Sequence, residues 1–197
     1  MNATDFWDEL HERRGAGTPK VNARLVEIVG RMSPGTALDL GCGSGGDALW
    51  LAARGWRVTA VDLSGAAVRA LRARGGPITA LRVDLAEGFP DGTFDLVSAQ
   101  YFHTPFELDR ARVLRTAAGA VNPGGRLVVV DHGSAAPWSW DQDAEYPTPD
   151  DVAAELDLDP AEWSIDRAEA AERLATGPAG RTATVIDHVL ILRRAGR

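Results

Sequence analysis

The stretch Asp39-Leu40-Gly41-Cys42-Gly43-Ser44-Gly45-Gly46 decides the fold of this chain. A short apolar run, residues 36–40, leads into it, and a stretch with helical spacing follows it. Glycines at such a junction permit a tight turn, allow a ligand to approach the backbone, and leave unpaired amides at the helix start. The stretch therefore predicts a strand, a ligand-binding turn and a helix, in that order.

The same alternation continues along the chain and predicts a parallel sheet. The expected parallel strands are residues 36–40, 57–61, 78–83, 94–99 and 126–131. Helix starts are indicated at Ser44, Ser64, Thr104 and Thr148, and helix ends at Gly55, Gly75 and Gly124. Two further extended runs, near residues 163–170 and 182–193, would close the sheet as an antiparallel pair. The fold class is therefore α/β.

We expect all 197 residues to form one domain. Its expected parts are an N-terminal helical cap (1–33), a ligand-binding core (36–131), a Pro/Trp-rich loop (133–149), and a C-terminal helix with the closing strand pair (150–197). The cap is expected to hold two helices.

Composition excludes several classes of function. The 21 basic and 28 acidic residues give a net charge of −7, which disfavours nucleic acid as a partner. Cys42 is the only cysteine, so there is no intrachain disulfide and no cysteine-rich zinc module, and a reducing compartment is favoured. Lys20 is the only lysine, which excludes a phosphate loop of the GxxxxGK type.

Neither a targeting segment nor a membrane span is indicated. The first ten residues are acidic rather than basic-then-apolar, unlike a secretory signal. Apolar runs such as residues 127–130 are far shorter than the roughly 18 residues of a span. We therefore expect a cytoplasmic protein without a membrane partner.

Carboxylates follow the first three predicted strands, at the edge where α/β sheets bind ligands. The pattern Gly41-x-Gly43-x-x-Gly46 alone satisfies a dinucleotide fingerprint. Asp62 lies 21 residues after Gly41, at the end of the second strand, where a carboxylate binds ribose hydroxyls, and Asp84 ends the third. Asp39, two residues before the first glycine, would repel a pyrophosphate but attract an ammonium or sulfonium cation. S-adenosylmethionine carries both cations.

This ordered set resembles the class I S-adenosylmethionine-dependent methyltransferases, which share an acidic residue before GxGxG and acidic residues after strands two and three. Residues 94–97 resemble the family's fourth strand, and residues 122–127 its turn into the fifth. The resemblance implies a Rossmann-like, doubly wound, seven-stranded sheet, mostly parallel, with an antiparallel last strand and helices on both faces. Residues 6–9 and 99–103 resemble the small bacterial tellurite-resistance and thiopurine-type subgroup.

The resemblance also implies roles for individual residues toward S-adenosylmethionine and its product S-adenosylhomocysteine. The implied cofactor contacts are Asp39, Gly41, Cys42, Gly43, Gly45, Asp62, Leu63, Asp84, Leu85, Ala99 and Gln100. Asp39 would help hold the methionine end, Asp62 would bind the ribose, and Leu63 would pack on one face of the adenine. Cys42 is expected to be a buried, inert thiol.

Two histidines follow the fourth and fifth strands on the same edge. His103 is the candidate general base, because a phenol, alcohol or protonated amine must lose a proton whereas a thiolate need not. His132 is assigned to the substrate pocket, and the alternative is that either ring only hydrogen-bonds a loop. No metal site is predicted, because the histidines lack a local ligand spacing such as HExxH and only Asp131 stands nearby.

Aromatic residues of the cap and loops complete the predicted pocket. Trp7, Tyr101, Trp138 and Trp140 would stack on a flat substrate or cover the sulfonium, and ordinary packing is the alternative.

The sequence predicts a methyltransferase that acts on a small-molecule acceptor by in-line displacement. A nicotinamide-dependent oxidoreductase using the same glycine-rich turn is the main alternative, disfavoured by Asp39 and by the lack of a recognisable Tyr-x-x-x-Lys. A non-catalytic cofactor-binding module is the other alternative.

Overall fold

The computed structural model describes residues 2–15, 17–139, 142–143 and 145–196. The helices are α1 (Ala3–Arg14), α2 (Ala23–Val29), α3 (Gly46–Ala53), α4 (Gly65–Arg74), α5 (Arg110–Gly119) and α6 (Pro149–Leu156), with a short 3₁₀ helix at Pro178–Gly180. The strands are β1 (Thr36–Leu40), β2 (Arg57–Asp62), β3 (Ile78–Arg82), β4 (Phe94–Gln100), β5 (Val121–His132), β6 (Trp163–Thr176) and β7 (Thr182–Arg194).

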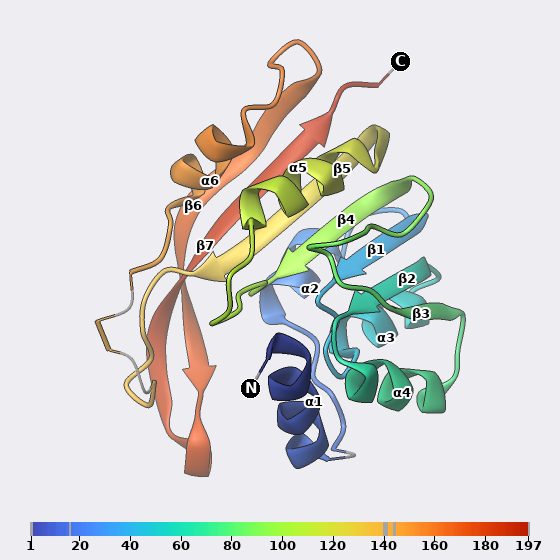
Figure 1. The fold of residues 1–197 in the computed structure, drawn as a ribbon. Helices are drawn as coiled ribbons and strands as arrows, with labels where there is room; N and C mark the ends of the chain where they lie inside the picture. Colours follow the sequence, from blue (N-terminus) through green and yellow to red (C-terminus); the bar gives the residue numbers. More distant parts are fainter. Residues whose placement is uncertain (1, 16, 140–141, 144, 197) are drawn as a thin grey trace.

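The strands form one seven-stranded sheet in the order β3-β2-β1-β4-β5-β7-β6 (Figure 1). β1 to β5 are parallel, whereas β7 runs antiparallel to both β5 and β6. This confirms the predicted fold class. The strand order reverses between β1 and β4, and ligands of open α/β sheets bind at such a switch point, beside the carboxyl ends of the strands.

Two apolar clusters cover the faces of the sheet and explain its buried strands. Residues of α2, α3 and α4 pack against one face, and residues of α5 and α6 pack against the other. Trp56, only 2% exposed, lies in the first cluster, as its position before an apolar strand indicates. With both faces covered, the inner strands read as continuous apolar runs rather than alternating ones.

The N-terminal cap consists of the two expected helices. α1 lies across the carboxyl ends of the strands, beside α4 (Figure 1). The side chain of Asp8 accepts hydrogen bonds from the Ser64 hydroxyl (2.6 Å) and the Ala66 N–H (2.9 Å) at the start of α4. The cap therefore lies over the edge where the ligand is expected.

Two predicted helix starts, at Thr104 and Ser44, are wrong. Thr104 starts no helix; its hydroxyl accepts from Phe106 N–H (3.3 Å), and α5 begins at Arg110 with Asp109 as N-cap. α3 has no side-chain cap from Ser44, because its N-cap is Gly45. The expected caps Ser64 and Thr148 are confirmed.

Three predicted boundaries also shift. α5 ends at Gly119, and Gly124, expected to end that helix, lies within β5, which starts at Val121. β3 ends at Arg82, so Asp84 lies two residues beyond it. β6 continues to Thr176. Most of its residues are exposed or only partly buried, but they pair with β7 along the whole hairpin.

None of the helices in the described ranges has the length and apolar character that crossing a membrane requires.

Candidate cofactor and acceptor site

The glycine-rich turn after β1 needs glycine for conformation and for space. Gly41, Gly43 and Gly45 have positive φ angles of 65°, 49° and 84°. A Cβ on Gly46 would lie 2.2 Å from the carbonyl oxygen of Lys20. Glycine tolerates the positive φ angles at the first three positions, and at Gly46 it allows the segment before α2 to pack closely against the turn.

A cavity of about 230 Å³ opens beside this turn. Its lining residues are Pro19, Lys20, Asn22, Asp39, Gly41, Cys42, Ser44, Gly46, Asp47 and Gln100. Two buried acceptors in this lining, Oδ2 of Asp39 and Oε1 of Gln100, have no hydrogen-bond partner within the described part of the chain. Since buried polar atoms are nearly always paired, these two acceptors indicate a site that suits a ligand rich in hydrogen-bond donors.

Asp39 belongs to a group of buried acidic side chains. Burial raises the pKa of Asp39 well above its usual value, and the neighbouring carboxylates of Asp47 and Asp62 raise it further. Burial likewise raises the pKa of Asp47 and of Asp62. A cation placed among these groups would lower their pKa values again, because an opposite charge favours the ionised carboxylate.

Asp62 connects the glycine-rich turn to the end of β2. Its carboxylate accepts from the Gly43 N–H and from the Ser64 N–H, both at 2.8 Å. The His11 ring of α1 lies over the turn, so a Cβ on Gly43 would be 3.3 Å from its Cε1. Asp62 is thus buried between the turn, α4 and the cap.

Four of the other predicted cofactor residues, Leu63, Asp84, Leu85 and Ala99, do not belong to the lining of this cavity, whereas Cys42 does. Ala99 is fully buried in β4, and Leu63 and Leu85 are half-buried. Asp84 is exposed, and its Oδ1 accepts from the Ala86 N–H at 2.9 Å. The Cys42 thiol is buried, and burial raises its pKa well above the usual value, so it stays protonated at neutral pH.

Sequence reasoning missed the contacts between Asn22 and Asp47. The Asn22 N–H and side-chain amide donate to the two Asp47 oxygens at 2.7 and 2.8 Å. The Ser44–Asp47 spacing suggested a helix cap, whereas Asp47 instead anchors the segment that precedes α2. Since this pairing joins positions 25 residues apart, no local pattern reports it.

A second group of side chains surrounds the ends of β4 and β5. The ring centroids of Tyr101 and His132 are 4.6 Å apart, and Tyr146 lies 5.6 Å from His132. His103 stacks at 6.1 Å from His132 on the same side. Burial lowers the pKa of His132, and His103 adds to the shift, so His132 is neutral at pH 7.

A buried carboxylate fixes the surroundings of His103. Asp131, 2% exposed, accepts two hydrogen bonds from Nη2 of Arg110, at 2.6 and 2.7 Å. The Nε2 atom of His103 lies 3.1 Å from Oδ1 of Asp131, close enough for an ion pair but outside hydrogen-bond geometry. The neighbouring His103 and Arg110 lower the pKa of Asp131 despite its burial, so it is ionised.

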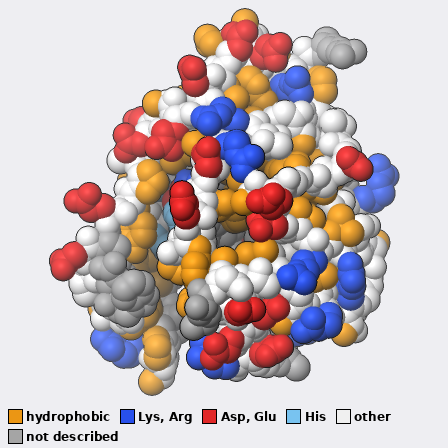
Figure 2. Space-filling view, viewed as in Figure 1, with side chains coloured by type: hydrophobic (Ala, Val, Ile, Leu, Met, Phe, Trp, Pro, Cys, Tyr) orange, Lys and Arg blue, Asp and Glu red, His pale blue; other side chains and the backbone are white. Residues whose placement is uncertain are grey.

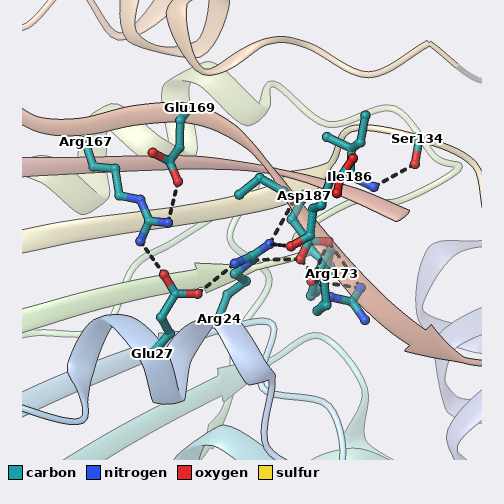
Figure 3. Close-up of polar contacts among 11 residues, drawn as sticks. Arg24, Glu27, Ser134, Arg167, Glu169, Arg173, Ile186 and Asp187 are labelled. Carbon is teal, nitrogen blue, oxygen red and sulfur yellow. Dashed lines mark hydrogen bonds and ion pairs between the residues drawn. The ribbon is translucent and has the colours of Figure 1, made fainter. Parts of the chain in front are cut away.

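Tyr101 is held by a network centred on Asp187, whose contacts with Arg24 and Arg173 can be followed in Figure 3. Its hydroxyl donates to Asp187 at 3.0 Å, and Asp187 also accepts from Arg24 (3.0 Å) and Arg173 (2.7 Å). Tyr101 has a φ of 52°, a strained value for a bulky residue. Burial and Asp187 raise the pKa of Tyr101 far above its usual value, so the phenol acts as a donor and not as a base.

The tryptophans lie apart from one another. The Trp7 indole N–H donates to the Thr104 hydroxyl at 3.4 Å, between α1 and the loop after β4. Trp138 packs on the hairpin of β6 and β7, where a Cβ on Gly177 would lie 2.3 Å from its Cδ2. Trp140 lies outside the described residues.

This chain is similar to known proteins in sequence and in fold. A family model described as "Methyltransferase domain" matches residues 38–129, which include β2, β3 and β4 and most of β1 and β5. "Ribosomal RNA small subunit methyltransferase C" from Chromohalobacter salexigens is 34% identical over 142 residues, 68% of this chain. The aligned part of this chain spans 42% of the length of that relative.

Solved structures match over nearly the whole chain. One comes from a study of the conversion of a disulfide bond into a thioacetal group during echinomycin biosynthesis; it is 26% identical, with a TM-score of 0.71, covering 98% of this chain and 93% of that one. TehB from Haemophilus influenzae has a TM-score of 0.70 at 16% identity, covering 96% of this chain and 67% of TehB, a likeness of fold.

The acidic residue before the glycine-rich turn, the switch point beside it and the family match agree with one another. The chain belongs to the class I S-adenosylmethionine-dependent methyltransferases.

Proposed function

We propose that this protein transfers a methyl group from S-adenosylmethionine to a small-molecule acceptor bound at the carboxyl ends of β4 and β5. The observation that carries the cofactor assignment to this cavity is the pair of buried, unpartnered acceptors, Asp39 Oδ2 and Gln100 Oε1. Both belong to the lining of the same cavity. Their combined chemistry fits the α-ammonium group of the cofactor.

The acidic lining argues against a dinucleotide in this cavity. A pyrophosphate beside Asp39 and Asp47 would add negative charge to carboxylates that burial already disfavours. An ammonium group would instead donate to both unpartnered oxygens. Asp39, which distinguishes a dinucleotide from S-adenosylmethionine, therefore argues against the oxidoreductase alternative.

Positioning is the main task of the protein in this reaction. The sulfonium of S-adenosylmethionine supplies an activated methyl carbon. Asp62 and the glycine-rich turn would orient the ribose and the methionine end, and α1 would limit access of water from above. Holding the methyl donor and the acceptor in line lowers the activation barrier, by about 7–11 kcal/mol in well-oriented systems.

His103 is the proposed base for acceptors that must lose a proton. Asp131, held by Arg110, faces Nε2 and would retain the proton there, which leaves Nδ1 to accept a proton from the acceptor. His132 and Tyr101 would form the flat wall beside it. If an oxygen or nitrogen acceptor is methylated, a His103→Ala variant should lose most turnover, and unchanged turnover would rule out this role.

The arginines favour a small acceptor over a nucleic acid, because several of them are engaged in hydrogen bonds within the protein. Arg72, Arg74 and Arg82 donate to the backbone carbonyls of Ala80, Gly17 and Leu63, so they support the fold. Acidic and basic side chains both occur across the face shown in Figure 2. The relative named for ribosomal RNA is more than twice as long as its matched part, and its recognition of RNA is not carried over.

Parallel calorimetric titrations with S-adenosylmethionine, S-adenosylhomocysteine and NADH test the cofactor. We expect saturable binding of the two adenosyl ligands and no heat of binding from NADH. Binding of NADH alone would overturn the proposal. A panel of thiols, phenols, amines and RNA oligonucleotides, assayed for S-adenosylhomocysteine formation, then tests the acceptor class; methylation of RNA alone would contradict the small-molecule assignment.

A further inference from the structure

Lys20 is the one positively charged residue among the described residues that line the cavity. The same lining carries the carboxylates of Asp39 and Asp47 and the side-chain oxygen of Gln100. Lys20 is exposed, and within the described ranges its ammonium takes part in no ion pair. Among the described residues, the lining therefore combines two buried carboxylates with one exposed ammonium group.

The backbone of Lys20 is fixed beside the turn. Gly46 allows the close approach, because any Cβ there would collide with the Lys20 carbonyl. Two residues later, Asn22 is bound to Asp47 through its backbone N–H and its side-chain amide. These contacts hold the start of the lysine side chain at the cavity while leaving its ammonium in solvent.

We propose that Lys20 binds the carboxylate of the methionine end of the cofactor. Asp39 and Gln100 then receive the α-ammonium group, so the cavity recognises both charges of a zwitterionic amino acid. This inference rests on the proposed function and goes beyond it, because it assigns ligand selectivity to a residue outside the glycine-rich turn. Adenosine derivatives that lack the amino-acid end gain nothing from Lys20.

Opposite charges at two places in one site also determine the orientation of the ligand. Reversing the amino-acid end would set its carboxylate against Asp39 and its ammonium against Lys20, two like-charge contacts instead of two favourable ones. A lysine at the rim suits this task, because its ammonium is a compact point charge on a flexible stem. Binding would therefore direct the methyl group toward the acceptor side in one orientation.

The test compares two ligands on three proteins. S-adenosylhomocysteine carries the amino-acid end, and 5′-methylthioadenosine lacks it. Dissociation constants are measured by calorimetry, directly or by competition, for wild type, Lys20→Met and Lys20→Arg. We expect Lys20→Met to bind S-adenosylhomocysteine roughly tenfold more weakly, the lower range for a charge-assisted hydrogen bond. Binding of 5′-methylthioadenosine should be unchanged, and Lys20→Arg should restore most of the affinity.

Arg31→Met is the matched control. Arg31 is exposed after α2 and precedes β1, so it stands at the opposite edge of the sheet, and its removal changes the net charge by the same amount. The Arg31→Met variant should bind both S-adenosylhomocysteine and 5′-methylthioadenosine with the affinities of wild type. Circular dichroism checks that each variant is folded.

The outcomes separate this inference from the proposed function. If wild type binds S-adenosylhomocysteine and Lys20→Met binds it equally well, the lysine assignment is wrong and the cofactor stands. The assignment is also wrong if Lys20→Met weakens both ligands by the same factor. If wild type binds neither ligand, the cofactor proposal itself fails, and the role of Lys20 fails with it.

Discussion

Two buried carboxylates in this protein have opposite surroundings. Asp39, at the proposed cofactor cavity, is 2% exposed and keeps an unpartnered oxygen among the described residues. Asp187, beside Tyr101, is fully buried and accepts from Arg24, Arg173 and Tyr101. Burial raises the pKa of Asp39. The pKa of Asp187 is lowered despite its burial, because Arg173 and Arg24 are its partners. The difference shows which buried charge supports the fold and which one is available to a ligand.

The largest expected effect is on folding, at Asp187. Asp187→Ala leaves Arg24 and Arg173 without their shared carboxylate, and breaking such a buried pair costs about 3–5 kcal/mol. Urea denaturation of wild type and variant measures the loss. A change below about 1 kcal/mol would mean that the arginines find water instead and that the network is not structural.

The next largest effect is on binding, at Asp39. Asp39→Asn removes a buried charge that lacks a full set of partners, so the free protein should be as stable as wild type or more stable. Affinity for S-adenosylhomocysteine should fall by about 10–100-fold, since a charge-assisted hydrogen bond is lost. Asp187→Ala is the reverse control, because it should lower stability first. Loss of stability in Asp39→Asn would contradict the contrast between the two sites.

The same contrast predicts opposite dependence on pH. A carboxyl whose pKa is raised on folding stabilises most below the unfolded value of 3.8 and loses that stability as pH rises through its folded pKa. Asp187 has a lowered pKa, so its stabilisation is present above 3.8 and is lost only at lower pH. As the pH falls from neutral toward 3.8, the stability advantage of Asp39→Asn over wild type should therefore shrink. A constant difference in urea denaturation would exclude Asp39 as the titrating group.

Local sequence patterns predict the arrangement at the ends of β1 and β2 better than the arrangement around β7, for a physical reason. Asp39, the glycines and Asp62 follow one another at strand ends, so local spacing reports their meeting at the carboxyl edge. Asp187 meets Arg24 from 163 residues away, and no periodicity in either segment records that contact. Thr104 shows the same limit, because its capping pattern predicts a helix start, whereas its hydroxyl accepts hydrogen bonds from Phe106 N–H and the Trp7 indole in a loop.

The smallest expected effect compares two carboxylates that the family resemblance treats alike. Asp84 is exposed, and its carboxylate accepts a hydrogen bond from the Ala86 N–H, two residues on. Asp84→Ala should therefore change stability by less than about 0.5 kcal/mol. Its contact with the adenine edge would be screened by water, and we expect S-adenosylhomocysteine affinity to fall about two- to fivefold.

Asp62→Ala is the matched comparison, because Asp62 is buried and anchors the Gly43 and Ser64 amides. Its affinity loss should exceed tenfold, from the ribose contact and from the released turn together. Calorimetry of the two variants against the same ligand gives the ratio directly. Equal losses would mean that burial does not distinguish the two carboxylates, and that the cofactor contacts the loop after β3 as strongly as the end of β2.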